Sequence, residues 1–448
     1  MTAEQLKASV LQMAIEGKLV PQLDDEPAVD IEAVEPEEVH FAIPEKWKWV
    51  TLEKLFNFVD YRGKTPIKSP SGVRLMTASN VRKGYIDHTR MEFISKEEFA
   101  TRQSRGISAK GDILFTTEAP LGNAALADLE EYSAGQRVIT LQSDTVNKQL
   151  YVYFLISPYF QKTLAENATG TTAQGIKAAK LKKLSLPLPP IAEQDRIVTL
   201  LNEILPLIEE YGKAHSALKN AEEALPAQLR ASFLQEAIQG KLVPQLDDEP
   251  AVEIAGEEPE EVPFAIPEKW KWVKLEDICL YIQRGKSPKY SDIQQYPVVS
   301  QKCNQWDGFH IEKAKFIQPE TIAKYEEKRI LRDGDLLWNS TGTGTLGRVA
   351  EYQNRLNPYG WAVADSHVTV VRCDQDIVDP TYLYFYLRNP SVQRVIEDQA
   401  EGSTNQKELS LKTIKAYPIP LPPLAEQRRI VARLEELLPH VDAIAGLR

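Results

Sequence analysis

Polar side chains that could read the edges of nucleic-acid bases are grouped in short loops of this sequence. Base readout uses amide, hydroxyl and guanidinium groups on exposed loops. The segments TASNVRK (77–83) and SQKCN (300–304) carry such groups at matching places after probable strands, and residues 341–348 add a third polar segment. The candidate base contacts are Thr77, Ser79, Asn80, Arg82, Lys83, Gln301, Lys302, Asn304, Thr341, Thr343 and Arg348.

A basic turn, Arg-Gly-Lys followed by Thr or Ser and then Pro, occurs at 62–66 and again at 284–288. It ends like a phosphate-binding P-loop, but Phe58 and Leu280 stand where that loop needs its first glycine. The turn is therefore either a surface turn or a phosphate contact. The candidate phosphate contacts are Arg62, Lys64, Arg284 and Lys286, with Lys180 and Lys183 from a basic run that is equally compatible with a solvated helix face.

A glycine-rich segment, 342–347, has the G-x-G-x-x-G spacing of a dinucleotide-binding loop, and Asp365 lies 18 residues beyond its last glycine. That site needs a helix to begin at the loop, so that the helix N-terminus meets the pyrophosphate. The residues that follow are few before Pro358 interrupts them, and the first half of the chain keeps only the last of the three glycines. The pattern favours a flexible polar loop.

Catalytic and metal-binding patterns do not appear in the sequence. The six histidines have no H-x-x-x-H or His/Cys spacing, and no Asn-Pro-Pro-aromatic motif for methylating a base is present. Glu326-Glu-Lys328 is an ExK triplet without the Pro-Asp that would precede it in a nuclease. No Ser/His/Asp or paired-carboxylate set occurs in both halves. The chain is therefore predicted not to be an enzyme, and to hold neither a cofactor nor a metal.

The negative charge of the chain is concentrated in two places. The formal net charge is −11, but 16 acidic residues lie within 24–38 and 247–261, two stretches without Lys or Arg. Without them the rest of the chain would carry +5. Acid confined to two linkers leaves the remaining surface compatible with a polyanion. The acidic stretches themselves are compatible with solvated linkers that have no direct role and, no more strongly, with a direct role of the acid.

The three cysteines, Cys279, Cys303 and Cys373, have no paired spacing, which suits a reducing cytosol. No apolar run approaches the roughly 18 residues of a membrane span, and the N-terminal residues lack a signal-peptide core. We therefore expect a cytoplasmic protein without a membrane partner.

The chain is an internal duplication. Residues 8–50 and 231–273 align without a gap, with 35 of 43 positions identical, which is too many for convergence. The segment PLPPIAEQDRIV at 187–198 returns as PLPPLAEQRRIV at 420–431. Between these near-identical parts lie two blocks that agree at frame positions and differ nearly everywhere else. Such a chain suggests one task performed on two different targets.

A long helix is predicted in the centre of the chain, from about 189 to 243, with a shorter copy at the C-terminus. Apolar residues at a 4-3 spacing are typical of a coiled-coil seam, and Pro206 and Pro439 are expected to kink the helices without ending them. The terminal pieces are the expected partners of the central helix. The predicted pairing positions are Ile197, Leu201, Ile204, Ile208, Tyr211, Leu218, Leu225, Ile430, Leu434, Leu437, Val441 and Ile444.

Each divergent block is predicted to be a mixed α/β domain. Short apolar runs such as KGDILFTTEA and GQRVITLQ alternate with turn residues, as strands do, and LYVYFLISPYFQKTLAENA at 150–168 is predicted as a helix. The expected division is a helix at 1–20, an acidic linker at 21–43, a first domain at 44–188, the central helix at 189–243, a second linker at 244–266, a second domain at 267–421 and a distal helix at 422–448.

Two stretches and the openings of the two blocks resemble a known family. GSTNQKELSLKTIKAYPIPLPPLAEQRRIVARLEEL, the shorter LPLPPIAEQDRIVTLLNEI and the block openings IPEKWKWV are similar to the specificity subunits of type I restriction-modification systems. The resemblance covers nearly the whole chain. It implies an α/β (α+β) fold with two target-recognition domains, long antiparallel helices and pseudo-twofold symmetry. The long acidic tethers depart from the family pattern.

The resemblance also implies a function and partners. Each domain would read one half of a bipartite site on double-stranded DNA, while the helices would set the gap between the halves. Two modification (M) subunits would dock on the helices, and two restriction (R) subunits would join through them. S-adenosylmethionine, ATP and Mg would be bound by these partners. The alternatives from the residues alone are a self-contained methyltransferase or nuclease, and a coiled-coil scaffold that binds only proteins.

Overall fold

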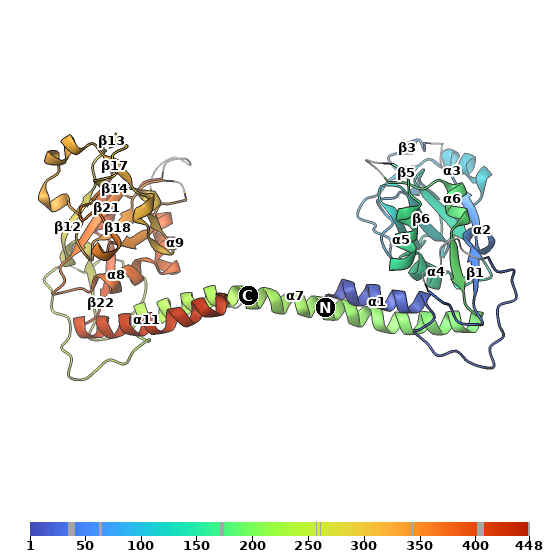
Figure 1. Cartoon of the computed structure of the whole chain (residues 1–448), viewed down its shortest axis with the longest axis horizontal. Coiled ribbons are helices and arrows are strands. Elements are labelled where there is room, and N and C mark those ends of the chain that lie inside the picture. Colours follow the sequence, from blue (N-terminus) through green and yellow to red (C-terminus); the bar gives the residue numbers. More distant parts are fainter. Residues whose placement is uncertain are drawn as a thin grey trace. The chain divides into compact units, whose positions relative to one another are not determined.

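The chain forms two compact units, Met1–Lys219 and Asn220–Arg448, which we call unit 1 and unit 2. The structure, a computed structural model, describes residues 1–34, 41–61, 65–170, 174–256, 258–259, 261–342, 344–400 and 407–446. The helix α7 (Ile191–Ile238) begins in unit 1 and ends in unit 2. Each unit combines a mixed β-domain with helices (Figure 1).

The domain of unit 1 contains two four-stranded sheets. The first is antiparallel, in the order β2 (Asn57–Asp60), β9 (Val138–Gln142), β6 (Ile113–Thr117), β7 (Leu121–Leu126). The second has the order β3 (Lys68–Ser69), β5 (Phe93–Ile94), β4 (Val73–Met76), β8 (Tyr132–Ala134), and its β4–β8 pair is parallel. A two-stranded pair joins β1 (Lys48–Thr51) to β10 (Ser185–Leu188). The helices are α2 (Leu52–Leu55), α3 (Lys96–Arg102), α4 (Lys148–Leu155), α5 (Pro158–Glu166) and α6 (Ala178–Lys183).

Unit 2 repeats this topology. Its antiparallel sheet has the order β12 (Cys279–Arg284), β21 (Val368–Cys373), β18 (Leu336–Asn339), β19 (Val349–Glu351). Its mixed sheet has the order β13 (Tyr290–Ser291), β17 (Lys315–Ile317), β14 (Pro297–Val299), β20 (Val363–Ala364), with β14–β20 parallel. The remaining elements are the pairs β11 (Lys271–Lys274) with β22 (Pro418–Leu421) and β15 (Asn304–Gln305) with β16 (Gly308–Phe309), and the helices α8 (Pro380–Leu387), α9 (Pro390–Asp398), α10 (Leu411–Lys415) and α11 (Leu424–Gly446).

The single helix predicted at 150–168 is wrong, because two helices occupy this segment. Pro158 cannot continue α4, since it has no backbone N–H, but it fits the first turn of α5. The Ser157 hydroxyl accepts a hydrogen bond from the Phe160 N–H and so caps α5. Asn389 and Pro390 make the same break before α9 in unit 2.

The helix α1 (Ala3–Ile15) has the predicted ends. Thr2 and Gln5 form a reciprocal capping box, and Gly17 follows the helix with φ +68°, a conformation that favours glycine. Leu11, Ala14 and Ile15 of α1 share one core with the first half of α7 and with α4. In Figure 1, α1 lies along α7.

The repeated segment A-E-Q, at 192–194 and 425–427, explains how each long helix is attached to its domain. Glu193 at the start of α7 is fully buried and accepts hydrogen bonds from the Trp47 indole and the Gln22 amide. Gln194 accepts from the Asn147 N–H and donates to the Pro189 carbonyl. In unit 2, Gln427 bonds in the same way to Asp379 and Pro422, while burial raises the pKa of the neighbouring Glu426.

The beginning of each acidic linker is held in place, which corrects the expectation of a fully solvated tether. Glu26 is buried and forms an ion pair with Arg196 of α7. The Lys46 ammonium donates to the Leu23, Asp24 and Glu26 carbonyls. Unit 2 repeats the ion pair with Arg429 and Glu249, and Lys269 repeats the carbonyl contacts. An acid can leave water here because each long helix supplies an arginine for it.

The predicted helix-pairing positions fall into three groups. Ile197, Leu201 and Ile208 are buried in the core of unit 1, and Ile430, Leu434 and Val441 are buried in unit 2. Ile204, Leu437 and Ile444 are half-buried, and Leu438 is buried beside Leu437. Tyr211, Leu218 and Leu225 are exposed, with exposed fractions of 40%, 59% and 40%.

The exposed group lies in the part of α7 beyond its packed ends. In unit 1, the Tyr211 hydroxyl donates a hydrogen bond to the Met1 carbonyl, next to the first residues of α1. The part of α7 that packs against α1 therefore ends near Tyr211. In unit 2, Arg230 of α7 forms an ion pair with Asp442 of α11, and Leu234, Ala237 and Ile238 share a core with α11. The regular 4-3 spacing predicted one continuous seam, but α1 is 13 residues long and α11 is 23, against 48 for α7. At about 1.5 Å per residue, the two short helices together are shorter than α7.

Candidate nucleic-acid interface

A parallel strand pair brings two loops of unit 1 to one edge of its mixed sheet. In the β4–β8 pair, Met76 lies opposite Ala134. Because the carboxyl ends of parallel strands meet at the same edge, the loop that begins at Thr77 lies beside the turn Gly135–Arg137. The Gly135 N–H donates to the Met76 carbonyl across this edge at 2.7 Å.

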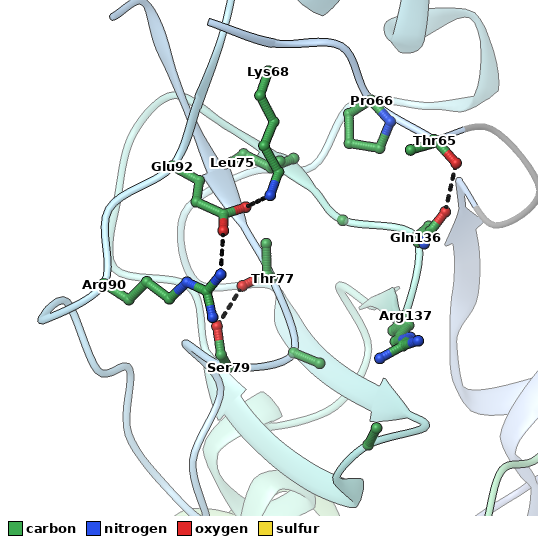
Figure 2. Close-up of a pocket in the computed structure, with 13 residues that line it drawn as sticks. Thr65, Pro66, Lys68, Leu75, Thr77, Ser79, Arg90, Glu92, Gln136 and Arg137 are labelled. Carbon is green, nitrogen blue, oxygen red and sulfur yellow. Dashed lines mark hydrogen bonds and ion pairs between the residues drawn. The ribbon is translucent and has the colours of Figure 1, made fainter. Parts of the chain in front are cut away.

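A cleft of about 420 Å³ opens at this edge. Figure 2 shows ten of its residues as labelled side chains, most of them polar. The lining residues are Thr65, Pro66, Lys68, Leu75, Thr77, Ala78, Ser79, Arg90, Glu92, Ala119, Gly135, Gln136 and Arg137. A second hollow of about 340 Å³ shares Gln136 and is also lined by Thr117, Glu118, Thr169, Gly175, Ile176 and Lys177. Gln136 therefore stands between two concave polar surfaces.

One wall of the cleft carries a charge cluster. The Glu92 carboxylate lies between Lys68, at 2.8 Å, and Arg90, at 3.0 Å (Figure 2). The hydrogen bond from Lys68 is the main cause that lowers the pKa of Glu92, so this carboxyl is ionised at neutral pH. Two largely exposed cations share one carboxylate, which leaves the cluster with a net charge of +1.

The opposite wall carries Gln136 and Arg137, both exposed. The Thr65 hydroxyl donates to the Gln136 side-chain oxygen at 3.0 Å. Arg137 lies 3.9 Å from Glu118, and both side chains are close to half exposed. An exposed ion pair of this length contributes at most about 1 kcal/mol, so Arg137 can exchange this partner for another.

The predicted residues of unit 1 have different surroundings. Thr77 and Ser79 line the cleft, where their hydroxyls lie 2.7 Å apart. Asn80 is only 1% exposed: it accepts from the Thr77 N–H and donates to the Asp87 and Arg90 carbonyls, so it anchors the loop and cannot reach a base. Arg82 is paired with Asp87 on the hairpin that follows, and Lys83 is exposed near its tip. Lys180 and Lys183 are exposed on α6 and do not line the cleft.

Unit 2 has the same edge with other residues. In the β14–β20 pair Val299 lies opposite Ala364, and the Asp365 N–H donates to the Val299 carbonyl at 2.9 Å. The turn Asp365–His367 is thus the counterpart of Gly135–Arg137. The predicted Gln301 and Thr341 meet here, because the Gln301 amide donates to the Thr341 hydroxyl at 2.9 Å. That hydroxyl lies 2.6 Å from the His367 ring, which extends the chain of polar contacts.

Other predicted residues of unit 2 hold the loops together. Asn304 is fully buried and donates to the Leu337 carbonyl and the Asn339 side chain. Arg348 donates to Gln305 and to the Gly344 carbonyl, beside the exposed ring of Trp306. Lys302, in the same loop as Asn304, is exposed.

The basic side chains of the second turn, 284–288, contact other residues of unit 2. Arg284 pairs with Glu408 and donates to the Leu409 carbonyl, and the Lys286 ammonium donates to the Lys324 carbonyl. Gly285 is required by close packing, because a Cβ at this position would lie 2.0 Å from the Ala364 carbonyl oxygen. The contacts of Arg284 and Lys286 are thus intramolecular. Arg62, Lys64 and Thr343 lie outside the described residues.

The glycine-rich segment is a loop, as the sequence favours. Gly342, Gly344 and Gly347 have positive φ angles, and the strand β19 follows them where a dinucleotide site needs a helix. In the described part of the chain, no three or more His, Cys, Asp or Glu side chains gather as metal ligands would. Among the helices of that part, none has the length and apolar character to span a membrane.

The sequence pattern missed Lys68, Arg90, Gln136, Arg137, Ser366 and His367. The signal for the last four was present, since each pair comes directly before an apolar run, VITLQ or VTVV. These four residues come just before the antiparallel strands β9 and β21. The sequence does not indicate that they lie beside the ends of β4 and β14, which belong to the other sheet of each unit. The pairing of β4 with β8 and of β14 with β20 decides this proximity.

Residues 44–213 and 267–446 both match the model of the type I restriction modification DNA specificity domain. The chain is 26% identical over 329 residues to the type I restriction enzyme EcoBI specificity subunit of Escherichia coli, covering 72% of this chain and 66% of that one. It is 23% identical over 423 residues to the EcoKI specificity subunit of E. coli strain K12, covering 90% and 84%.

The fold is similar to that of the HsdS subunit from Thermoanaerobacter tengcongensis in its crystal structure, with a TM-score of 0.52 and 19% identity over 92% of this chain and 94% of that one. The family model matches most of the chain in two copies, and the two units repeat one topology. The chain therefore belongs to the type I restriction modification DNA specificity domain family.

Proposed function

We propose that this chain is the DNA sequence-specificity subunit of a type I restriction-modification complex, in which each domain reads one half of a bipartite DNA site. The observation that carries the proposal is the repeated sheet edge. Two domains of one topology present different side chains at equivalent turns, Gln136 and Arg137 in one and Ser366 and His367 in the other. The parts around them, such as the linkers and the A-E-Q attachment, are nearly identical.

The proposal assigns no chemistry to this chain. Methyl transfer to adenine and DNA cleavage are the work of two modification subunits and of two restriction subunits bound through them. S-adenosylmethionine, ATP and Mg then belong to those partners. The uncovered apolar positions Tyr211, Leu218 and Leu225 of α7 support a protein partner on this helix. A cytoplasmic location follows from the DNA substrate, and the three cysteines are unpaired.

The test is to express the chain with its cognate modification subunit in a host that lacks adenine methylation, and to map methylated adenines across the genome. We expect one split motif, two short specific sequences separated by a gap of fixed length. A contiguous motif, or none in a complex that does assemble, contradicts the proposal. Methyl transfer or cleavage by the purified chain alone would favour a self-contained enzyme. Failure of the assembled complex to bind DNA would favour a protein scaffold.

A further inference from the structure

The two turns at the sheet edges are equivalent by their hydrogen bonds and differ in their side chains. Gly135 and Asp365 make the same backbone contact, to Met76 and to Val299. Counting from these residues, Gln136 corresponds to Ser366 and Arg137 to His367. The fold therefore offers two adjacent positions per domain at which side chains can vary without disturbing the backbone bond that fixes the turn.

In unit 1 these positions carry the donors best suited to purines. Arginine donates in a fork to the O6 and N7 atoms of guanine, and glutamine pairs with the N6 and N7 atoms of adenine, both in the major groove. Gln136 and Arg137 are exposed and line the cleft, and Gln136 also lines the second hollow. The loop opposite them is fixed from behind by the buried Asn80, so the cleft is largely preformed.

The charges around the cleft fit a DNA backbone on the other wall. Lys68 and Arg90 are more than half exposed and share the Glu92 carboxylate on the side of the cleft opposite Gln136 and Arg137 (Figure 2). Phosphate contacts fix register and orientation, while base contacts specify sequence. This division of roles places phosphate on the Lys68 and Arg90 wall and base edges on the Gln136 and Arg137 wall.

In unit 2 the side chains at the same positions are shorter, and both contact neighbouring side chains. Ser366 accepts a hydrogen bond from the Ser287 hydroxyl, and His367 meets Thr341. A hollow at this edge, lined by Gly285, Lys286 and Ala364 among others, holds only about 10 Å³, against about 420 Å³ for the cleft of unit 1. The two edges thus offer different surfaces to their half-sites.

We propose that Gln136 and Arg137 are the specificity-determining residues for purines in the half-site read by the first domain. Ser366 and His367 are the corresponding residues for the other half-site. This inference rests on the proposed function and goes beyond it, because it names the side chains and the class of base that they read.

The experiment compares methylation maps of the assembled complex for the wild type, Arg137→Ala, Gln136→Ala and His367→Ala. Losing a bidentate base contact relaxes the preference at one position by roughly 10- to 100-fold. We expect Arg137→Ala to relax a guanine position, and Gln136→Ala an adenine position, both in the same half of the motif. His367→Ala should leave that half unchanged and alter only the other one.

Lys162→Ala is the matched control, since Lys162 is an exposed cation of the same domain that pairs with Glu166 and lies outside both hollows. It should leave the base preference at every position unchanged. Thermal unfolding of each complex checks that the variants are folded. A folded Arg137→Ala complex that keeps the wild-type preference at every position overturns the inference, as does relaxation of an A·T pair in place of a G·C pair. If the wild type itself yields no split motif, the proposed function fails instead, so the two failures are distinguishable.

Discussion

At the scale of single residues, polar side chains in these loops divide into those that present a surface and those that hold it. Asn80 and Asn304 have the residue type of adenine-reading groups, yet both are buried and bond the backbone of neighbouring segments. Short polar side chains commonly satisfy loop backbone in this way, because a loop lacks the internal hydrogen bonds of a helix or sheet. The exposed neighbours of these anchors are therefore the better candidates for contact with DNA.

Replacing the anchor Asn80 by Ala is expected to destabilise unit 1 by about 1–3 kcal/mol. The change leaves the carbonyls of Asp87 and Arg90 without their side-chain donor in a buried place. Urea denaturation measures the loss, and hydrogen exchange should show that it begins in the hairpin at 81–90. Lys83→Ala, a change of an exposed side chain in the same hairpin, should stay within about 0.5 kcal/mol of the wild type. Equal effects of the two changes would show that Asn80 is not an anchor.

Replacing Glu92 by Gln is expected to strengthen binding to DNA without a target site. Lys68 and Arg90 lose the carboxylate that they share, so about one more phosphate charge can be neutralised. Binding of a fluorescent duplex across a salt series should then show a log–log slope steeper by up to about 0.9. Glu130→Gln is a control with the same charge change, because Glu130 pairs with Lys110 away from the cleft lining. An identical slope for both variants would place the DNA backbone elsewhere.

The same ion cluster has a predictable pH dependence. The pKa of Glu92 in the folded chain is lowered from its ordinary value of 4.5. Its contribution to stability is therefore fully present above that value, and is lost as the pH falls through the lowered pKa. The difference in DNA binding between Glu92→Gln and the wild type should accordingly be constant from pH 6 to pH 8.

At the scale of elements, the long helix α7 has a regular apolar spacing along its length, but only its two end parts pack against other helices. Its first half shares a core with α1 and its last residues share one with α11. The acidic linkers support both places, because Arg196 pairs with the buried Glu26 and Arg429 pairs with the half-buried Glu249. The apolar residues in the middle of the helix, such as Leu218 and Leu225, continue the same spacing as the buried residues but are exposed.

Two leucines of this helix give a matched test. Leu201→Ala removes a fully buried side chain and should cost about 2–5 kcal/mol of unfolding free energy. Leu218→Ala removes a side chain that is 59% exposed and should change the stability of the free chain by less than about 0.5 kcal/mol. Urea denaturation of the full chain measures both. If Leu218→Ala costs as much as Leu201→Ala, the middle of α7 is covered in the free chain. A loss of affinity for the modification subunit in Leu218→Ala alone would support the proposed docking of that subunit on α7.

At the scale of the whole molecule, the chain is a duplication whose second copy of the helical frame is divided between its ends. The terminal helices α1 and α11 pack on α7 in unit 1 and in unit 2, and each unit then repeats the same attachment of helix to domain. The length of α7 between its packed ends is the property that would determine the gap between two half-sites.

Inserting four helix-favouring residues after His215 is expected to lengthen the unread gap of the methylated motif by one or two base pairs. Four residues add about 6 Å to a helix, and successive base pairs are about 3.4 Å apart. The methylation map of the assembled complex measures the gap. The same four residues inserted after Pro250, in the exposed part of the second linker, should leave the gap unchanged. An unchanged gap after the insertion in α7 would mean that this helix does not set the spacing.

The repeated frame of this protein can be predicted from its amino-acid sequence alone. The duplication, the helix ends at Thr2 and Gly17, and the positions Leu201 and Leu434 are local or periodic features, and such features can be read along one chain. The resemblance to a family rested on the same repeated segments. The sequence does not distinguish the buried anchors Asn80 and Asn304 from exposed polar residues, because burial depends on neighbours that are distant in the sequence.

Which residues form the cleft depends on contacts between strands that are distant in the sequence. Thr77 and Gln136 are far apart in the chain and line the same cleft because β4 and β8 pair in parallel. No periodicity in the sequence predicts this pairing. The exposure of Leu218 was likewise set by where α1 and α11 lie along α7, since a helical pattern specifies an apolar face but not what covers it.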